Sequence, residues 1–538
     1  MKHSRSSSLT SPVLPKPVHN AHTSGLAKSI GRGTIFGIIA NSSQVITRLV
    51  TVPIVISHLG LDGYGIWSII MTTATYMRFG SVGVKTAFQK YVAETTGTGD
   101  YEKANKLLST GFALMLAFSV AGLIPVSLFS YKIALASGVP PQFLNSASGA
   151  ISLLAWIMVL SNAGATFEAI VMGGHRIDLV RKYATILTIA EAISIVVLLH
   201  FGYGLFAMAA TMGISELIYV VLCAAVSKRI VPQISLSWRR VTHKVLYELF
   251  RFAGSYQLLN LLEVLYVSLL PFAVLRSFGA TEAGVLALVN RIVTSAAIIQ
   301  EAFLPPILSG GALVFASGSV EKLKLLLTKA FKVTLAMTLF PLGYIALFGT
   351  TLAFAWTGQI NTTFRFAFWM VCLTNLFKSF SLLALVLYRT TGKALLDNVR
   401  QLLRIVVIIG VVWLSPRLGF DGSLSGLAFA ELVGMIFMFF ALSKTFSEFR
   451  ANLLFSDMSR LTLAIILILF GGVALSKVPV PSGLTDRTSA TLTLFMAGFG
   501  CVLTAWPAIF LTRAINGSEL RALFGRFFER TNNPAAAE

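Results

Sequence analysis

The sequence is poor in charge and in cysteine. Charged residues make up 12% of the 538 residues, whereas 55% are apolar. A soluble domain of this size could neither bury so much apolar surface nor cover the remainder with so few charges. The three cysteines, Cys223, Cys372 and Cys501, lie singly in apolar runs, with no CxxC spacing and no neighbouring histidine. We expect buried hydrophobic side chains at these positions, without a disulfide or a metal site.

Signals of secreted and ATP-driven proteins are also missing. Residues 1–30 contain no apolar run followed by a small-residue cleavage site, so they predict a disordered, basic cytoplasmic tail and no signal peptide. The phosphate-binding pattern GxxxxGK[ST] is absent, because its nearest fragment, Thr391-Gly392-Lys393, lacks the first glycine and the final hydroxyl. We therefore expect no bound cofactor, and a gradient-driven transporter is favoured over a pump with its own motor.

Long apolar runs recur along the whole chain. A membrane-spanning helix needs roughly 20 mainly apolar residues, and the sequence predicts about fourteen such spans. The short alternating strands of a barrel are absent, so the expected fold is an all-α polytopic membrane protein. The predicted spans are Thr34–His58, Tyr64–Val84, Leu107–Ser130, Ala150–Met172, Ala184–His200, Leu205–Val226, Leu249–Leu275, Gly284–Leu308, Ala330–Phe348, Phe366–Leu387, Leu396–Leu414, Leu424–Leu442, Leu461–Leu475 and Leu492–Leu511.

The formal net charge of +21 is concentrated on one side of these spans. Lysine and arginine are frequent in both tails, in alternate loops and at the adjoining span ends, where we also place Arg400 and Arg404. Such an excess marks the cytoplasmic side, so both termini are predicted to be cytoplasmic and the charge needs no nucleic acid to explain it. The opposite loops are short, roughly 20 residues at most, which is too little for a folded outer domain.

An internal duplication relates the first six spans to the next six. Gly60–Gly65 aligns with Gly279–Gly284, and Glu216 aligns with Glu431, at separations of roughly 215–219 residues. Because six spans separate the copies, both have the same orientation, which is typical of parallel repeats about an axis along the membrane normal. We expect a six-helix lobe at 31–230, a second at 245–450, two further helices at 458–512 and a cytoplasmic tail at 513–538.

Several basic residues fall inside the predicted spans. An ionisable side chain at a helix centre costs about 2.5–3.5 kcal/mol, so it usually faces a cavity or a partner. One hypothesis is a cationic cavity between the lobes, in which arginine forks bind a diphosphate or an acidic sugar. The alternative is internal neutralisation of Arg48, Arg78 and Arg291 by intramembrane glutamates. The candidate substrate-binding residues are Arg48, Arg78, Lys85, Asn260, Arg291 and Lys378.

Three intramembrane acids are candidates for ion coupling. Glu263 lies on the seventh predicted span, and Glu216 and Glu431 occupy equivalent positions in the two copies. They could bind a coupling proton or cation, or they could form structural contacts within each lobe. No spacing in the sequence predicts a metal centre.

The first two spans carry a recognisable set of residues. They are Asn41, Arg48, Pro53, the run His58–Trp67 and the run Arg78–Lys85, and Gly284 with Arg291 repeats part of the pattern in the second copy. This set resembles the polysaccharide-transporter branch of the multidrug/oligosaccharidyl-lipid/polysaccharide (MOP) flippase superfamily. The resemblance implies flipping of polyprenyl-diphosphate-linked oligosaccharide units across a bacterial inner membrane by alternating access, for lipopolysaccharide or exopolysaccharide synthesis. Membrane lipids, a polysaccharide polymerase and chain-length proteins are the implied partners.

Other functions remain open at this stage. A multidrug or cation antiporter and a peptidoglycan-precursor flippase would share the fold. A drug-cation exporter needs an acidic cavity, however, and the span Thr34–His58 lacks the acid that many such relatives carry. A polytopic glycan polymerase or ligase would be an enzyme, and the short outer loops argue against one.

Overall fold

The computed structural model describes residues 23–77, 88–89, 91–92, 95, 99–296, 320–390, 395–445, 451–479 and 485–512. Within these ranges the regular structure is helical and contains no strand. Residues 280–296 also form a helix. The other helices are α1 (Thr23–Met77), α3 (Tyr101–Leu128), α4 (Ser130–Ala136), α5 (Leu144–Gly173), α6 (Ile177–His200), α7 (Leu205–Ile230), α8 (His243–Phe278), α10 (Val320–Thr357), α11 (Phe364–Thr390), α12 (Leu395–Thr445), α13 (Ala451–Ser476) and α14 (Asp486–Thr512), with short 3₁₀ turns at Pro141–Phe143 and Trp238–Arg240.

The polytopic all-α architecture is confirmed. Every predicted span has a helix in the described ranges, and nine of these helices are long and apolar enough to cross a membrane. Two of them each cover two predicted spans joined without a loop: α12 covers both of its spans, and α1 covers the second of its spans as far as Met77, where the described residues end. The joints are Gly60 (φ 71, ψ 176) and Gly419 (φ 71, ψ 178), in a backbone region that only glycine adopts readily. Helix α1 begins at Thr23, which lies inside the segment predicted as a tail.

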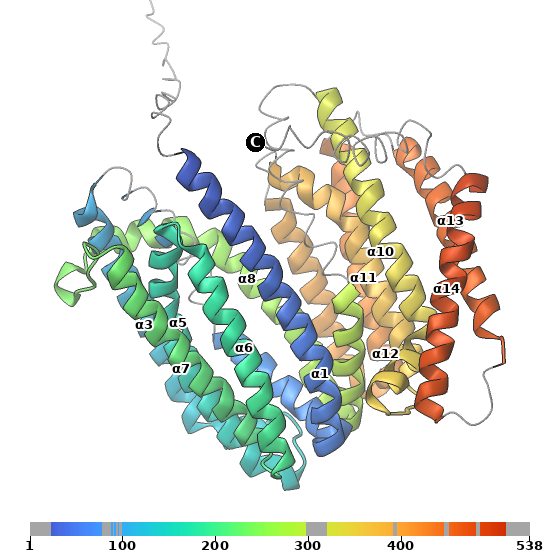
Figure 1. Cartoon of the computed structure of the whole chain (residues 1–538), viewed down its shortest axis with the longest axis horizontal. Coiled ribbons are helices and arrows are strands. Elements are labelled where there is room, and N and C mark those ends of the chain that lie inside the picture. Colours follow the sequence, from blue (N-terminus) through green and yellow to red (C-terminus); the bar gives the residue numbers. More distant parts are fainter. Residues whose placement is uncertain are drawn as a thin grey trace, which may run out of the picture.

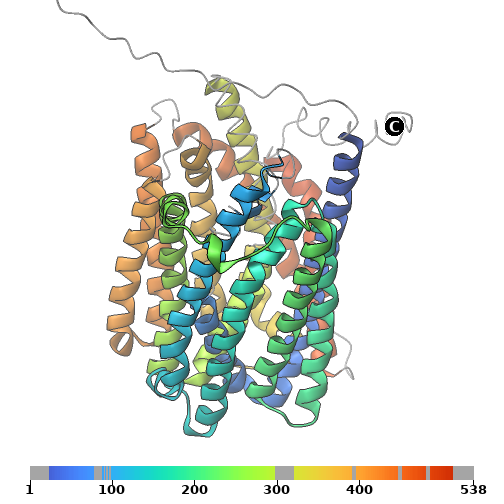
Figure 2. The ribbon, with the colours of Figure 1, turned by 90° about the vertical axis from the view of Figure 1, so that its left-hand side faces the viewer.

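The helices form two lobes with the same internal packing. In the first lobe α1 packs on α6, α5 on α7 and α3 on α5; in the second, α8 packs on α12, α11 on α12 and α10 on α11. In Figure 1 helices α3 to α7 of the first lobe lie on the left, α10 to α12 of the second lie on the right, and α1 and α8 lie between them. Figure 2 shows that the axes of the long helices are roughly parallel or antiparallel to one another. The duplicated segments therefore fold into duplicated bundles.

The last two helices, α13 and α14, form a hairpin at the outer edge of the second lobe (Figure 1). They pack on each other and against α10. The hydroxyl of Tyr344 on α10 donates to the carbonyl of Leu494 on α14 at 2.8 Å, which ties the hairpin to the lobe. This hairpin has no residue on the interlobe cavity described below.

The two lobes meet at repeat-equivalent residues, at the end of the molecule that holds the Gly60 joint. A Cβ on Gly65 would lie 2.4 Å from the carbonyl oxygen of Ala280, and a Cβ on Gly284 would lie 2.2 Å from that of Leu61. Thr281 also donates to Asp62 at 2.7 Å, across a separation of 219 residues that equals the repeat length. Asp62 and Thr281 are counterparts in the two copies, and the contacts Gly65–Ala280 and Gly284–Leu61 are equivalent under exchange of the copies, so the pseudo-two-fold axis passes between them. An apolar core that includes Leu61, Tyr64, Ala280 and Ala283 closes this end.

Candidate functional site

A cavity of about 680 Å³ lies between the lobes. Its walls come from α1, α6 and α7 of the first lobe and from α8, helix 280–296, α11 and α12 of the second. The apolar wall includes Val52, Trp67, Met208, Leu270 and Leu286, and charged side chains from both lobes project between them. Among the residues that the structure describes, no three His, Cys, Asp or Glu side chains are grouped so that they could hold a metal ion.

Arg48 of α1 and Arg291 of helix 280–296 both line this cavity. Their positive charges are close enough to repel each other, and the Tyr64 hydroxyl lies near both. Within the described part of the chain neither forms an ion pair with a carboxylate, and the buried Nε of Arg291 has no hydrogen-bond partner. Asn290 and Thr294 extend the polar stripe of Arg291 along the same wall. Two guanidinium groups that line one cavity and form no ion pair among the described residues are suited to a multiply charged anion.

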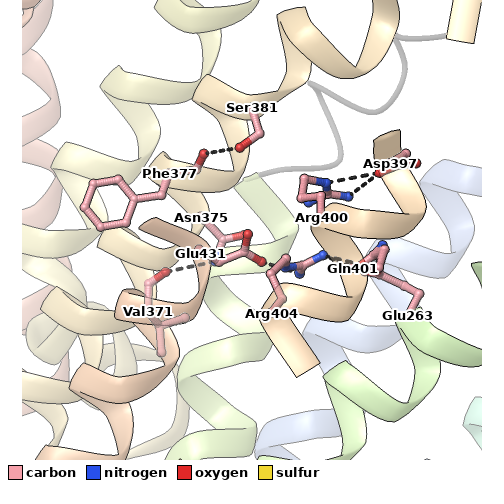
Figure 3. A network of polar contacts seen from close by, with 10 residues as sticks. All are labelled: Glu263, Val371, Asn375, Phe377, Ser381, Asp397, Arg400, Gln401, Arg404 and Glu431. Carbon is pink, nitrogen blue, oxygen red and sulfur yellow. Dashed lines mark hydrogen bonds and ion pairs between the residues drawn. The ribbon is translucent and has the colours of Figure 1, made fainter. Parts of the chain in front are cut away.

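A buried ion-pair network forms the wall of the second lobe (Figure 3). Arg404 of α12 lies at its centre and is 1% exposed. Its guanidinium donates to Glu263 of α8 at 3.3 Å, to Glu431 and to the side-chain oxygen of Gln401. The Gln401 amide donates in turn to Glu263, and the guanidinium carbon of Arg404 lies 3.6 Å from the ring centre of Tyr266. Glu263 and Glu431 are therefore already paired with a cation from their own lobe.

A second buried pair lies one turn away on α12. Arg400 donates through Nε and a terminal nitrogen to Asp397, at 3.0 and 2.9 Å, and both side chains are buried. Arg400 and Arg404, expected at a cytoplasmic span end, are the sixth and tenth residues of α12, and both are buried and paired with acids. Hydropathy and spacing alone do not distinguish an arginine that reaches for the surface from one that points inward to acids on the same or a neighbouring helix.

Comparisons with known proteins agree with this fold. Residues 34–197 match the MatE family model, and no curated protein matches the sequence. The lipid II flippase MurJ, in an inward closed conformation, superposes with a TM-score of 0.67 at 12% identity, covering 88% of this chain and 99% of that chain. The chain has the fold of the MOP transporters. An inward-facing MATE family transporter of the MOP superfamily gives a TM-score of 0.60 at 17% identity, covering 78% of this chain and 98% of that one. A MOP superfamily transporter from Pyrococcus furiosus, described by a binding pocket of reverse polarity, gives 0.58 at 16% identity over 78% of this chain and 96% of its own.

The other predicted site residues of this MOP fold are distributed unevenly. Lys378 of α11 is exposed on the cavity wall beside Asn375, and its charge attracts Glu263. Glu216 of α7 does not line the cavity, although Glu191, a cavity residue of α6, feels its negative charge. Asn260 lies on α8, but its side chain is outside the described residues, as are Arg78 and Lys85 entirely. The structure thus brings Arg48, Arg291, Lys378, Glu263 and Glu431 to one cavity and leaves Glu216 apart.

The Arg404–Glu431 pair should contribute strongly to stability. Replacing Glu431 by alanine leaves a buried guanidinium without its main partner, and breaking a buried pair in this way costs about 3–5 kcal/mol. We expect a clear fall in the thermal unfolding midpoint of Glu431→Ala in detergent. Glu102→Ala is the control, because its pair with Lys106 is largely exposed and water screens the attraction between the two charges. Equal shifts in the two variants would contradict the importance assigned to the buried pair.

Proposed function

We propose that the protein flips lipid-linked oligosaccharide repeat units across the bacterial inner membrane. The observation that carries this proposal is the pair Arg48 and Arg291, which face an interlobe cavity without a carboxylate partner among the described residues. A polyprenyl diphosphate presents two adjacent anionic groups, and each arginine fork can donate two hydrogen bonds to phosphate oxygens. Lys378, on the second lobe with Arg291, would add a contact to the diphosphate or to an acidic sugar.

The direction of access follows from the contacts between the lobes. The lobes are closed where Asp62 meets Thr281 and Gly65 meets Gly284, at the end remote from Thr23 and Thr512. With both termini in the cytoplasm, as the distribution of lysine and arginine predicts, this closed end faces outward. The structure would then be a state closed toward the outside. Rocking of the two lobes would open the cavity to that side.

A second function deserves a test because of one observation. The match to the lipid II flippase MurJ extends over 88% of this chain, which is more than the 78% covered by the MATE transporter. A peptidoglycan-precursor flippase would use the same diphosphate chemistry and differ in the sugar. A multidrug or cation antiporter is less favoured, because Arg48, Arg291 and Lys378 leave the cavity without the excess of negative charge that attracts cationic drugs.

Deletion of the gene in its host tests the proposal. We expect loss of surface polysaccharide and a build-up of completed carrier-linked units on the cytoplasmic face of the inner membrane. Quantification of surface glycan together with inner-membrane lipid-linked oligosaccharide measures both. Unchanged surface glycan with cell lysis would favour the peptidoglycan-precursor flippase. Accumulation of units on the outer face would show that the protein acts after the flipping step, as a polymerase or ligase does.

A further inference from the structure

The guanidinium of Arg404 occupies a site with the chemistry of a cation-binding site. The carboxylates of Glu263 and Glu431 and the side-chain oxygen of Gln401 accept its hydrogen bonds, and the face of Tyr266 covers it at 3.6 Å. Carboxylate and amide oxygens are the ligands of hard cations, and an aromatic face attracts positive charge. Two helices supply these groups, α8 and α12, so the site links the cavity wall to the interior of the second lobe.

Ion pairing stabilises the buried charges of this site, because some of its polar atoms have no hydrogen-bond partner in the described part of the chain. Within the described residues, Oε2 of Glu431 and Nε of Arg404 are both buried without a hydrogen-bond partner. A buried carboxylate needs a nearby positive charge, because desolvation otherwise makes its charged form very costly. Arg404 supplies that charge to Glu431, which is 1% exposed, and to Glu263 on the cavity side. Removal of the guanidinium would leave two acids facing the space that the guanidinium now fills.

The first lobe shows that the fold itself does not require this arginine. Counting from the match between Arg181 and Arg400, the position equivalent to Arg404 is Thr185, whose hydroxyl donates to the carbonyl of Arg181. The acid is nevertheless present in both copies, as Glu216 and Glu431. Only the second lobe therefore combines the repeated acid with an internal cation at these aligned positions.

We propose that Arg404 is a built-in cation that fills an ion site of the second lobe. Glu263 and Glu431 are then unavailable to a coupling ion from solution, and binding of sodium, potassium or a proton at these two acids does not drive transport. This replaces the role of ion-coupling residues that the sequence suggested for them. The inference does not depend on which lipid-linked sugar the protein carries.

Thermal unfolding of the purified protein in detergent tests the inference. The probes are sodium, potassium and low-millimolar guanidinium chloride, each compared with N-methylglucamine chloride at equal ionic strength. A ligand that binds only the folded state raises the midpoint in a saturable way. We expect no saturable shift in the natural protein, and a saturable rise with guanidinium in Arg404→Ala. The triple variant Arg404→Ala/Glu263→Gln/Glu431→Gln should lose that rise, because the carboxylates that bind the probe are gone.

Arg417→Ala is the matched control, because Arg417 is an exposed arginine of α12 that does not line the cavity. It should behave as the natural protein does. A folded Arg404→Ala variant that ignores guanidinium would overturn the proposal. A saturable sodium or potassium response of the natural protein that Glu263→Gln removes would overturn it as well. Arg404→Lys should fold and show no saturable shift with guanidinium. If Arg404→Ala does not fold, Arg404→Lys and the sodium and potassium titrations of the natural protein still test the proposal.

Discussion

Replacing Arg48 and Arg291 together by alanine will abolish export of surface polysaccharide in a complemented deletion strain. Each guanidinium is expected to make at least one charge-assisted hydrogen bond to the diphosphate, worth about 1.5–3 kcal/mol. Since about 1.4 kcal/mol corresponds to a factor of ten, each single variant should lose tenfold or more in apparent affinity and the double variant a hundredfold or more. The measurement is surface glycan at matched membrane levels, together with binding of polyprenyl diphosphate to the purified protein.

Two controls separate the site from the overall charge. Arg417→Ala removes the same charge from an exposed position outside the cavity and should retain export. Arg48→Lys and Arg291→Lys keep the charge but lose the planar fork, so they should be intermediate. Full export by the double alanine variant would remove these residues from the transport path and with them the main support for an anionic substrate.

Adding one methyl group to Gly65 will prevent the lobes from closing as they do in the structure. A Cβ there would lie 2.4 Å from the backbone oxygen of Ala280 and 2.5 Å from the backbone nitrogen of Gly284, so no side-chain movement can relieve the clash. Overpacking of this kind costs about 1–3 kcal/mol, which shifts a two-state equilibrium by about fivefold to a hundredfold. We expect Gly65→Ala, and likewise Gly284→Ala, to favour a state opened at this end.

A cysteine cross-link reports the closed state directly. Asp62 and Thr281 are hydrogen-bonded at 2.7 Å, so Asp62→Cys/Thr281→Cys should form a disulfide readily when the lobes are closed. The natural cysteines Cys223, Cys372 and Cys501 are buried. Cross-linking should fall about tenfold in the Gly65→Ala background and remain unchanged with Gly410→Ala, where a Cβ meets no atom within 4 Å. Equal yields in both backgrounds would show that this contact does not control closure.

The fold could be predicted from the sequence because its determinants are local and periodic. Apolar runs of span length specify membrane helices one by one, and the repeated run Gly60–Gly65 and Gly279–Gly284 specifies the duplication. The loop-free joints at Gly60 and Gly419 were harder to see. A glycine between two apolar runs predicts a turn, but its sequence does not distinguish a loop from a single residue at φ 71.

The candidate site could be predicted only in part. Arg48, Arg291 and Lys378 stand out because a charge inside an apolar run is conspicuous. Arg404 does not stand out in this way, because it lies ten residues into a helix that begins near basic residues. Its partner Glu263 is 141 residues away. Pairing over such a distance depends on which helices pack together, and the packing of α8 against α12 is a property of the folded lobe.

The separation of Arg404 from its partners also sets an order for the biogenesis of the protein. Glu263 is synthesised before Arg404, whereas Glu431 follows it by 27 residues on the same long helix α12. An arginine at the centre of an inserting helix costs about 2.5–3.5 kcal/mol while it is unpaired. When the first half of α12 enters the bilayer, Glu263 of α8 is therefore the acid available to pair with Arg404. Glu431 can pair with Arg404 only after the second half of α12 has been synthesised and has folded back at Gly419. Full neutralisation of Arg404 thus requires three segments together: α8 and the two halves of α12.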